Sequence, residues 1–221
     1  MVELTVDRHV LEANERQADQ NRAVFNENGL FVINLMSSPG AGKTSLLENT
    51  IERLRDRINI GVIEGDIQSA RDAERVAQKG VQAVQIETDG ACHLDGVMIR
   101  EAAQVFDLAA LDLLVVENVG NLVCPAEFNL GEDVKVMILS VAEGDDKPMK
   151  YPLMFQLSKV LLVNKIDLLP YLDCDVEKIK SEARQLNPEQ TIFEISCRTG
   201  QGLDAWCDWL VEQVDAKKKN I

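Results

Sequence analysis

One short stretch, residues 31–54, constrains what this chain can fold into more than any other. The apolar run Phe31-Val-Ile-Asn-Leu-Met is typical of a buried strand, and a glycine-containing loop that ends in Gly42-Lys43-Thr44 follows it at once. Apolar residues then recur at helical spacing from Ser45 to Leu54. The order of strand, loop and helix predicts a P-loop, in which loop amides and a helix N-terminus surround a polyphosphate.

Each position of this loop has an expected role. We expect Lys43 to place a cation beside the terminal phosphates and the Thr44 hydroxyl to ligate Mg²⁺. The remaining phosphate contacts are expected from Ser38, Gly40, Ala41 and Gly42. The usual pattern begins with glycine, whereas this chain has Ser37, which is acceptable there if its φ is negative. An ordinary glycine-rich turn is the alternative, and it gives no reason for Lys-Thr at this place.

The composition favours one domain with a sizeable core, because the chain has 221 residues of which 46% are hydrophobic. A net charge of −14 argues against nonspecific nucleic-acid binding, which needs clustered Lys and Arg. No stretch resembles a membrane span or a signal peptide, so we expect a cytoplasmic protein. The five cysteines are scattered, which favours thiols or metal ligands over a disulfide framework.

Strand and helix patterns alternate along the chain. We predict a helical leader over 1–29, a nucleotide-binding domain over 30–216 and a solvated basic tail over 217–221. Apolar runs predict strands near 59–64, 81–86, 112–117, 134–141, 159–163 and 191–195, and one of the intervening helices is expected to begin at His93. Such alternation predicts an α/β P-loop NTPase, with a mostly parallel sheet covered by helices on both faces.

The base-binding segment is expected at Asn164-Lys165-Ile166-Asp167, directly after an apolar strand. The Asp167 carboxylate can accept hydrogen bonds from N1–H and the 2-amino group of guanine, and adenine offers neither donor. Asn164 is expected to brace the loop, and the Lys165 stem to lie along the base. Ser196-Cys197 follows the next strand, where a backbone N–H can reach the guanine O6.

A magnesium site is expected where the strand over 112–117 ends. Glu117 can hold Mg²⁺ directly or through water, and the Gly120 N–H can reach the γ-phosphate. Asp66 and Asp72 could complete the Mg²⁺ shell or form a switch that senses the γ-phosphate, and helix capping is the alternative for both. Asn121 follows Gly120 where a water-orienting Gln could stand, so we expect slow intrinsic hydrolysis.

A transition-metal site is possible at Cys92-His93 and Cys124, which follow two different strands on the nucleotide side of the sheet. Thiolate and imidazole suit Zn²⁺ or Ni²⁺. One chain offers three ligands here, so either the site keeps an open position or a second copy completes it. Two incidental thiols and a helix-capping histidine are the alternative. We assign Cys174 to the surface and Cys207 to the core.

Taken together, these motifs make the chain similar to the HypB family, GTPases that assist nickel insertion during [NiFe]-hydrogenase maturation. The resemblance covers nearly the whole chain and includes Ser37; the matching segments are 34–44, 64–67, 92–95, 117–125, 143–148 and 164–167. It implies that Cys92, His93 and Cys124 are a metal site shared by two protomers that pair when GTP is bound. It also implies GTP/GDP, Mg²⁺ and Ni²⁺ as ligands, with Zn²⁺ possible at the same site.

The resemblance further implies two partners, the nickel chaperone HypA and the hydrogenase large-subunit precursor. Some members carry an N-terminal Cys-rich site or a His-rich tract, and residues 1–29 contain neither.

Three other readings stay open. A UreG-like GTPase would place Cys-Pro-His at its metal, whereas here Cys92 and His93 are adjacent and a separate Cys124-Pro125 follows. A purely regulatory GTP-binding module would have incidental cysteines. An ATP-dependent small-molecule kinase is opposed by Asp167.

Overall fold

The structure is a computed structural model that describes residues 6–66 and 71–219, with the side chains of 6–8 and 71–72 outside the description. The role expected of Asp72 therefore lies outside the described residues. The helices are α1 (Val6–Glu27), α2 (Lys43–Leu54), α3 (Arg71–Ala77), α4 (Gly96–Ala103), α5 (Cys124–Glu127), α6 (Lys147–Lys150), α7 (Pro152–Leu157), α8 (Val176–Leu186) and α9 (Leu203–Lys219). The strands are β1 (Phe31–Ser37), β2 (Ile60–Asp66), β3 (Gln82–Glu87), β4 (Leu113–Glu117), β5 (Val134–Ser140), β6 (Val160–Asn164) and β7 (Thr191–Glu194).

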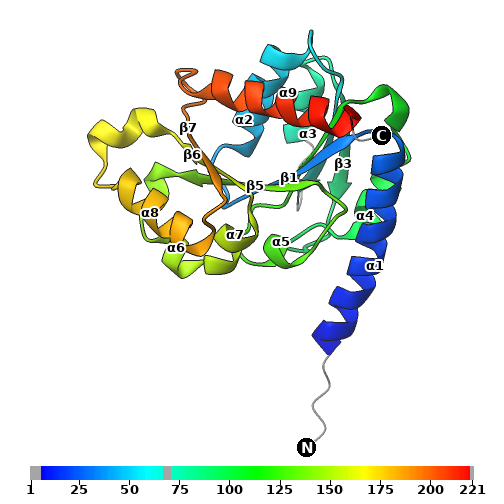
Figure 1. Cartoon of the computed structure of the whole chain (residues 1–221), viewed down its shortest axis with the longest axis horizontal. Coiled ribbons are helices and arrows are strands. Elements are labelled where there is room, and N and C mark those ends of the chain that lie inside the picture. The colour runs from blue at the N-terminus through cyan, green and yellow to red at the C-terminus, as the bar shows by residue number, and fades with distance from the viewer. Residues whose placement is uncertain (1–5, 67–70, 220–221) are drawn as a thin grey trace, which may run out of the picture.

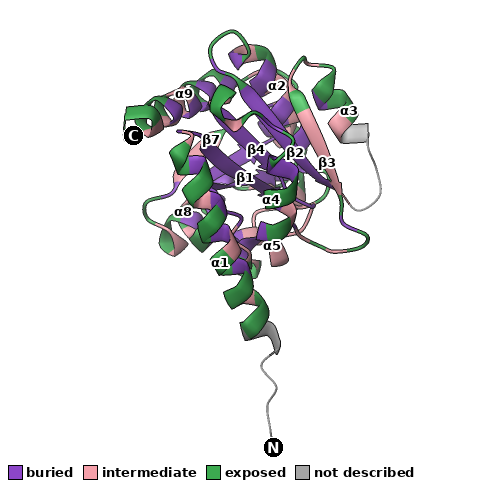
Figure 2. Ribbon diagram, turned by 90° about the vertical axis from the view of Figure 1, so that its right-hand side faces the viewer, coloured by how far each residue is buried: buried purple, intermediate pink, exposed green. Residues whose placement is uncertain are grey.

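These strands form one sheet in the order β3-β2-β4-β1-β5-β6-β7, and every described pair is parallel. The strands β1, β4, β5 and β6 are buried along their whole length, as expected of strands covered on both faces. Figure 2 shows these strands as the buried centre of the molecule. The predicted α/β P-loop architecture is confirmed.

Alternate side chains of β1 divide the core between the two faces of the sheet. Phe31, Ile33 and Leu35 pack with α2 and α9 on one face. Val32 packs with α1 and α4 on the other face, and Met36 packs there with α7 and α8. In Figure 1 the two helices α2 and α9 lie along one side of the sheet, and α1 runs beyond the body of the molecule at its N-terminal end. This two-sided packing fixes the carboxyl edge of the sheet, where the strand-to-helix loops gather.

Two local predictions are wrong. The helix α4 begins at Gly96 rather than His93, because the Asp95 carboxylate accepts from the N–H groups of Val97 and Met98 at 2.9 Å each and caps it. Residues 217–219 are the last turn of α9 rather than a solvated tail. Lys217 forms an ion pair with Asp133, which ties this turn to the body.

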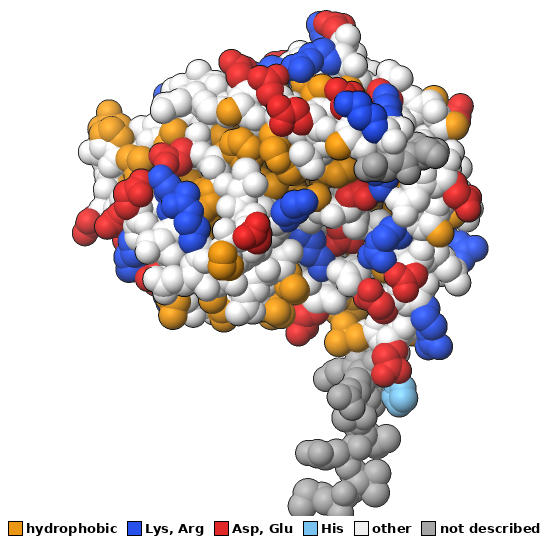
Figure 3. Space-filling view, viewed as in Figure 1, with side chains coloured by type: hydrophobic (Ala, Val, Ile, Leu, Met, Phe, Trp, Pro, Cys, Tyr) orange, Lys and Arg blue, Asp and Glu red, His pale blue; other side chains and the backbone are white. Residues whose placement is uncertain are grey.

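Among the described helices, none has both the length and the apolar character needed to cross a membrane. On the face drawn in Figure 3, acidic and basic side chains are interspersed rather than gathered into a basic patch.

Candidate nucleotide and metal site

The loop between β1 and α2, where phosphate binding is expected, contains two glycines with positive φ. Gly40 and Gly42 have φ of +75° and +109°, values that L side chains rarely adopt. Ser37 is not among the described non-glycine residues with positive φ, so the expected condition on it is met. Its hydroxyl accepts a hydrogen bond from the Lys43 ammonium at 3.1 Å, a contact that glycine could not provide. Lys43 is thereby held in the loop beside a cavity of about 520 Å³.

The base-binding segment is tied directly to this loop. The Asn164 amide donates to the Ala41 carbonyl at 2.9 Å, and the Lys165 ammonium donates to the Gly40 carbonyl at 2.6 Å. A Cβ at Gly42 would lie 2.5 Å from Asn164 Nδ2, so only glycine permits this approach. The bracing role expected of Asn164 is therefore seen in its contacts.

Asp167 and the loop after β7 line a second cavity, where the base is expected. The Ser196 hydroxyl donates to Asp167 Oδ1 at 2.6 Å, and the Cys197 N–H donates to Asn164 Oδ1 at 3.3 Å. This second cavity is lined by Gly42, Ser45, Asn164, Lys165, Asp167, Leu168, Cys197 and Arg198. Burial raises the pKa of the Cys197 thiol to about 11, so this residue stays a neutral thiol near pH 7.

The residues expected at Mg²⁺ converge on the larger cavity. Thr44 and Glu117 are both buried, and Thr44 Oγ1 donates to Glu117 Oε1 at 3.2 Å. Asp66 and Gly120 line the same cavity. Hydroxyl and carboxylate oxygens are the hard donors that Mg²⁺ prefers, so these residues fit that ion.

The sequence reasoning missed several residues that line the larger cavity, among them Glu64, Arg75 and Asn118. Glu64 is buried in β2, directly opposite Glu117 in the parallel register. An acid at the end of an apolar strand was the signal available for it. Arg75 pairs with Glu48 of α2, with Nη2 lying 2.7 Å from Oε2. The burial of Asn118 depends on partners far away in sequence, so no local pattern could have indicated it.

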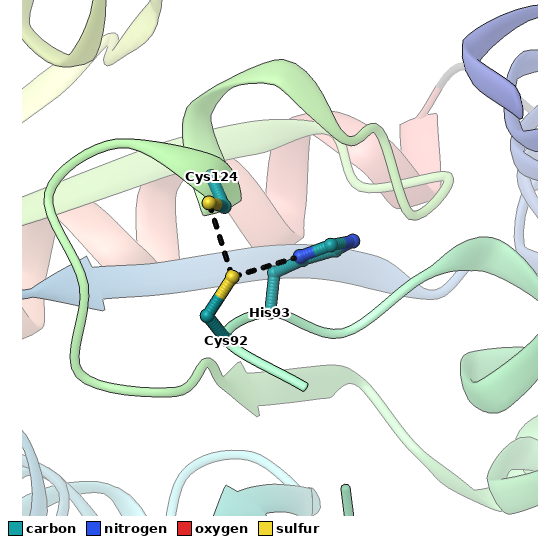
Figure 4. A group of neighbouring side chains, drawn as sticks. All are labelled: Cys92, His93 and Cys124. Atoms are coloured by element: carbon teal, nitrogen blue, oxygen red, sulfur yellow. Dashed lines mark hydrogen bonds between the residues drawn. The ribbon is translucent and has the colours of Figure 1, made fainter. Parts of the chain in front are cut away.

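Cys92, His93 and Cys124 form a compact cluster on this same edge of the sheet. One donor atom from each residue lies within 4.8 Å of the others. Cys92 Sγ is 3.1 Å from Cys124 Sγ and 3.6 Å from His93 Nδ1, as Figure 4 shows. Two thiolates that bind one ion at about 2.3 Å lie roughly 3.3–3.8 Å apart, so a small separation of the sulfurs would admit a metal. The expected meeting of the two loops is found.

Neighbouring residues fix the orientation of the cluster. The His93 ring packs on the Phe128 ring, with centroids 3.8 Å apart and planes inclined by 31°. The Asn121 amide donates to the Cys92 carbonyl at 3.3 Å, and its oxygen accepts from the Val123 N–H at 2.9 Å. Cys124 begins α5, with Pro125 at the first turn as is common in helices. Asn121 thus joins the two loops that carry the sulfur donors.

Protonation of the cluster follows from its surroundings. Burial lowers the pKa of His93, against the opposing influence of Asp95 and Glu127, which favours the neutral imidazole that binds metals. The hydrogen bond to Cys92 is the main cause of a raised pKa at Cys124. The raised pKa keeps Cys124 a neutral thiol in the metal-free protein, and a bound metal ion would displace its proton.

Cys174 and Cys207 lie elsewhere. Cys207 is buried in the core as expected, whereas Cys174 is half-buried against the α7–α8 core rather than on the open surface. Burial raises the pKa of Cys207 to about 11.

A family model for the CobW/HypB/UreG nucleotide-binding domain matches residues 31–194. The hydrogenase maturation factor HypB of Escherichia coli strain K12 is 51% identical over 213 residues, which cover 96% of this chain and 73% of that protein.

Two solved structures are similar throughout. HypB from Helicobacter pylori in complex with nickel has a TM-score of 0.88 at 40% identity, covering 94% of this chain and 96% of that one. The hydrogenase maturation factor HypB from Archaeoglobus fulgidus has a TM-score of 0.87 at 41% identity, with coverage of 92% and 99%.

Proposed function

The chain belongs to the HypB hydrogenase maturation factors of the CobW/HypB/UreG family, and on this premise we propose that it is a GTP-hydrolysing nickel metallochaperone for [NiFe]-hydrogenase maturation. Nickel is the cargo, bound by Cys92, His93 and Cys124. The GTPase cycle controls when that cargo is held and when it is released.

One observation carries the proposal. Glu117 lines the nucleotide cavity, and seven residues later the same segment supplies Cys124 to the sulfur cluster. A loop whose start contacts the nucleotide and whose end binds the metal can change both together. A regulatory module with incidental cysteines would have no need for this connection.

The nucleotide chemistry follows from the residues around the two cavities. Asp167, oriented by Ser196, selects guanine through its carboxylate, while Asn164 and Lys165 hold the base pocket against the P-loop. Bound Mg²⁺ would neutralise phosphate charge, held by Thr44, Glu117 and Asp66. The main-chain amides of the loop and of Gly120 are expected to orient the phosphates.

The same residues give no strong activator of water. Lys43 supplies a fixed cation for the developing phosphate charge. Asn121 stands after Gly120, where a water-orienting Gln could be, and in this structure its amide is used to hold Cys92. A slow intrinsic GTPase that a partner or a second copy accelerates is the expected result.

A second copy of the chain would complete the metal site. One protomer supplies three donors, Cys92 is exposed, and nickel accepts at least four ligands in thiolate and imidazole sites. Pairing of two protomers in the GTP state, with release after hydrolysis, supplies a switch between holding and transferring the ion. The expected partners for transfer are HypA and the hydrogenase large-subunit precursor, in the cytoplasm.

The test is a nickel titration of the purified protein with GDP and with a non-hydrolysable GTP analogue, each with the molecular mass recorded. We expect nickel to bind through thiolates and its affinity or stoichiometry to change with the nucleotide together with dimerisation. Nickel binding that is absent, or indifferent to both nucleotide and mass, would overturn the proposal. Cys92→Ala and Cys124→Ala separate it from the regulatory module, in which metal binding and pairing would survive.

A further inference from the structure

The side chain of Asn118 occupies the junction between the nucleotide cavity and the Cys92–His93 loop. It follows Glu117 directly, it is fully buried, and it lines the nucleotide cavity. Its oxygen accepts two backbone hydrogen bonds, from Val119 N–H at 2.9 Å and from Leu94 N–H at 3.1 Å. Leu94 is the residue after His93, so one amide oxygen joins the end of β4 to the metal-binding loop.

The amide nitrogen of Asn118 continues the connection into β1. It donates to Asn34 Oδ1 at 3.1 Å, and Asn34 Nδ2 donates in turn to Glu132 Oε1 at 3.3 Å. Lys135 lies 3.7 Å from Glu132, and its ammonium donates to the Ala126 carbonyl at 2.6 Å.

Ala126 belongs to α5, the short helix that Cys124 begins. The buried chain of polar groups therefore starts beside one sulfur-bearing loop and ends beside the other.

The Cys92–His93 loop has a second attachment to the nucleotide side. The Thr88 N–H donates to the Asp66 carbonyl at 3.1 Å, and the Thr88 hydroxyl donates to the Ala91 carbonyl at 2.8 Å. The loop is thus held at one end by β2 and at the other by Asn118. From the segment that follows β4, the side chains of Asn118 and Asn121 both bond to this loop, so each contact can be removed by substitution.

We propose that Asn118 is a positioning residue that transmits the nucleotide state from the end of β4 to the Cys92–His93 loop. This inference rests on the proposed function and names the residue through which its two sites communicate. Buried amide groups must keep hydrogen-bond partners. If the Glu117–Gly120 segment moved alone, the Leu94 N–H would lose its hydrogen bond to Asn118, which is unfavourable. The loop therefore follows the segment, and the spacing of the nickel ligands changes with it.

The measurable quantity is the ratio of nickel dissociation constants in the GDP and GTP-analogue states. Nickel chloride is titrated against the full chain in each state, and the thiolate-to-nickel charge-transfer absorption reports occupancy. Coupling between two sites is commonly about 5- to 150-fold. For Asn118→Ala we expect this ratio to fall to within about twofold of one, whatever the absolute affinity. A role in stability alone would weaken nickel binding in both states and leave the ratio unchanged.

Two matched variants sharpen the comparison. Asn118→Asp keeps an oxygen acceptor for the Leu94 and Val119 N–H groups and loses the donor to Asn34 Oδ1. Because the coupling is assigned to the acceptor oxygen, this variant should retain most of the wild-type ratio. Asn121→Ala removes the other side-chain contact between this segment and the Cys92–His93 loop, and it should weaken nickel binding in both states. Because the proposal assigns the coupling to Asn118, the ratio should be preserved in Asn121→Ala, and loss of the ratio there would overturn that assignment. If thermal unfolding shows that Asn118→Ala does not fold, Asn118→Ser, whose shorter side chain does not reach Leu94, replaces it in the comparison.

The possible outcomes separate failure of the proposed function from failure of the role assigned to Asn118. A wild-type ratio of one overturns the nucleotide-linked part of the proposed function, and the role of Asn118 with it. A wild-type ratio well above one that persists in a folded Asn118→Ala or Asn118→Ser protein overturns only the role of Asn118.

Discussion

Replacing Asp167 by asparagine should change which nucleotide the protein binds. Asp167 Oδ1 already accepts from the Ser196 hydroxyl at 2.6 Å. In Asp167→Asn the amide oxygen would keep that bond, so the new NH₂ group would face the donor edge of guanine. One charge-assisted bond is lost and two donors oppose each other in the pocket that Asp167 lines.

The cost can be worked from these changes. A hydrogen bond to a charged group contributes about 1.5–3 kcal/mol, and an unsatisfied buried donor costs about 1–3 kcal/mol. The sum, about 2.5–6 kcal/mol, is a loss of roughly 10²- to 10⁴-fold in GTP affinity. Xanthine carries a carbonyl oxygen where guanine carries its 2-amino group, so Asp167→Asn should gain affinity for XTP.

The assay is calorimetric titration of GTP, XTP and ATP into wild-type and variant protein with Mg²⁺. Asp173→Asn is the matched control, because it removes the same charge from an exposed position and should leave all three affinities unchanged. Retention of GTP affinity within threefold, with no gain for XTP, would refute the assignment of base selection to Asp167. A wild-type protein that binds ATP as well as GTP would revive the kinase reading.

Three further outcomes are expected. Cys92→Ala or Cys124→Ala should lower nickel affinity about 100-fold or more in a competition titration, since loss of a group that only hydrogen-bonds to a ligand already costs about 10- to 100-fold. Unchanged affinity would place the metal elsewhere. Trp206→Phe should lower the free energy of unfolding by about 2 kcal/mol, or roughly 4–8 °C in Tm. The buried indole N–H donates to Thr50 Oγ1 at 3.1 Å, and the smaller ring would lose this bond and leave a void. An unaltered melting curve would contradict this expectation. Alkylation at pH 7.5 should modify the exposed Cys92 before Cys197, because a pKa of about 11 keeps the Cys197 thiol protonated until the pH approaches that value. Peptide mass spectrometry reports the order of modification, and early modification of Cys197 would contradict its burial.

Most of the fold could be predicted because the buried strands are apolar runs in the sequence and the longer helices have apolar residues at helical spacing. The run at 160–164, for example, is buried throughout and ends at Asn164 as the base-binding motif required. The parallel arrangement followed from alternation alone. The sequence did not show whether His93 or Asp95 precedes the first turn of α4, since both residues stand before the same apolar pattern.

The candidate site likewise contains residues that a sequence motif predicts and residues that none does. Lys43, Thr44 and Asp167 have recognisable spacing, and the structure brings the P-loop and the base-binding segment into contact. Asn118 has no such pattern, because its partner Asn34 is 84 positions away and the contact depends on the pairing of β4 with β1. A residue whose role depends on strand order cannot be found before that order is known.

The strand order also separates two properties of the protein. The sulfur ligands follow β3 and β4, the base-reading loops follow β6 and β7, and the P-loop follows β1 between them. Under the proposed function, nucleotide selection and metal binding therefore lie on opposite halves of the sheet, with the phosphate-binding loop between them. A chimera that exchanges the chain from β6 onward should therefore change the nucleotide preference and keep the three metal ligands.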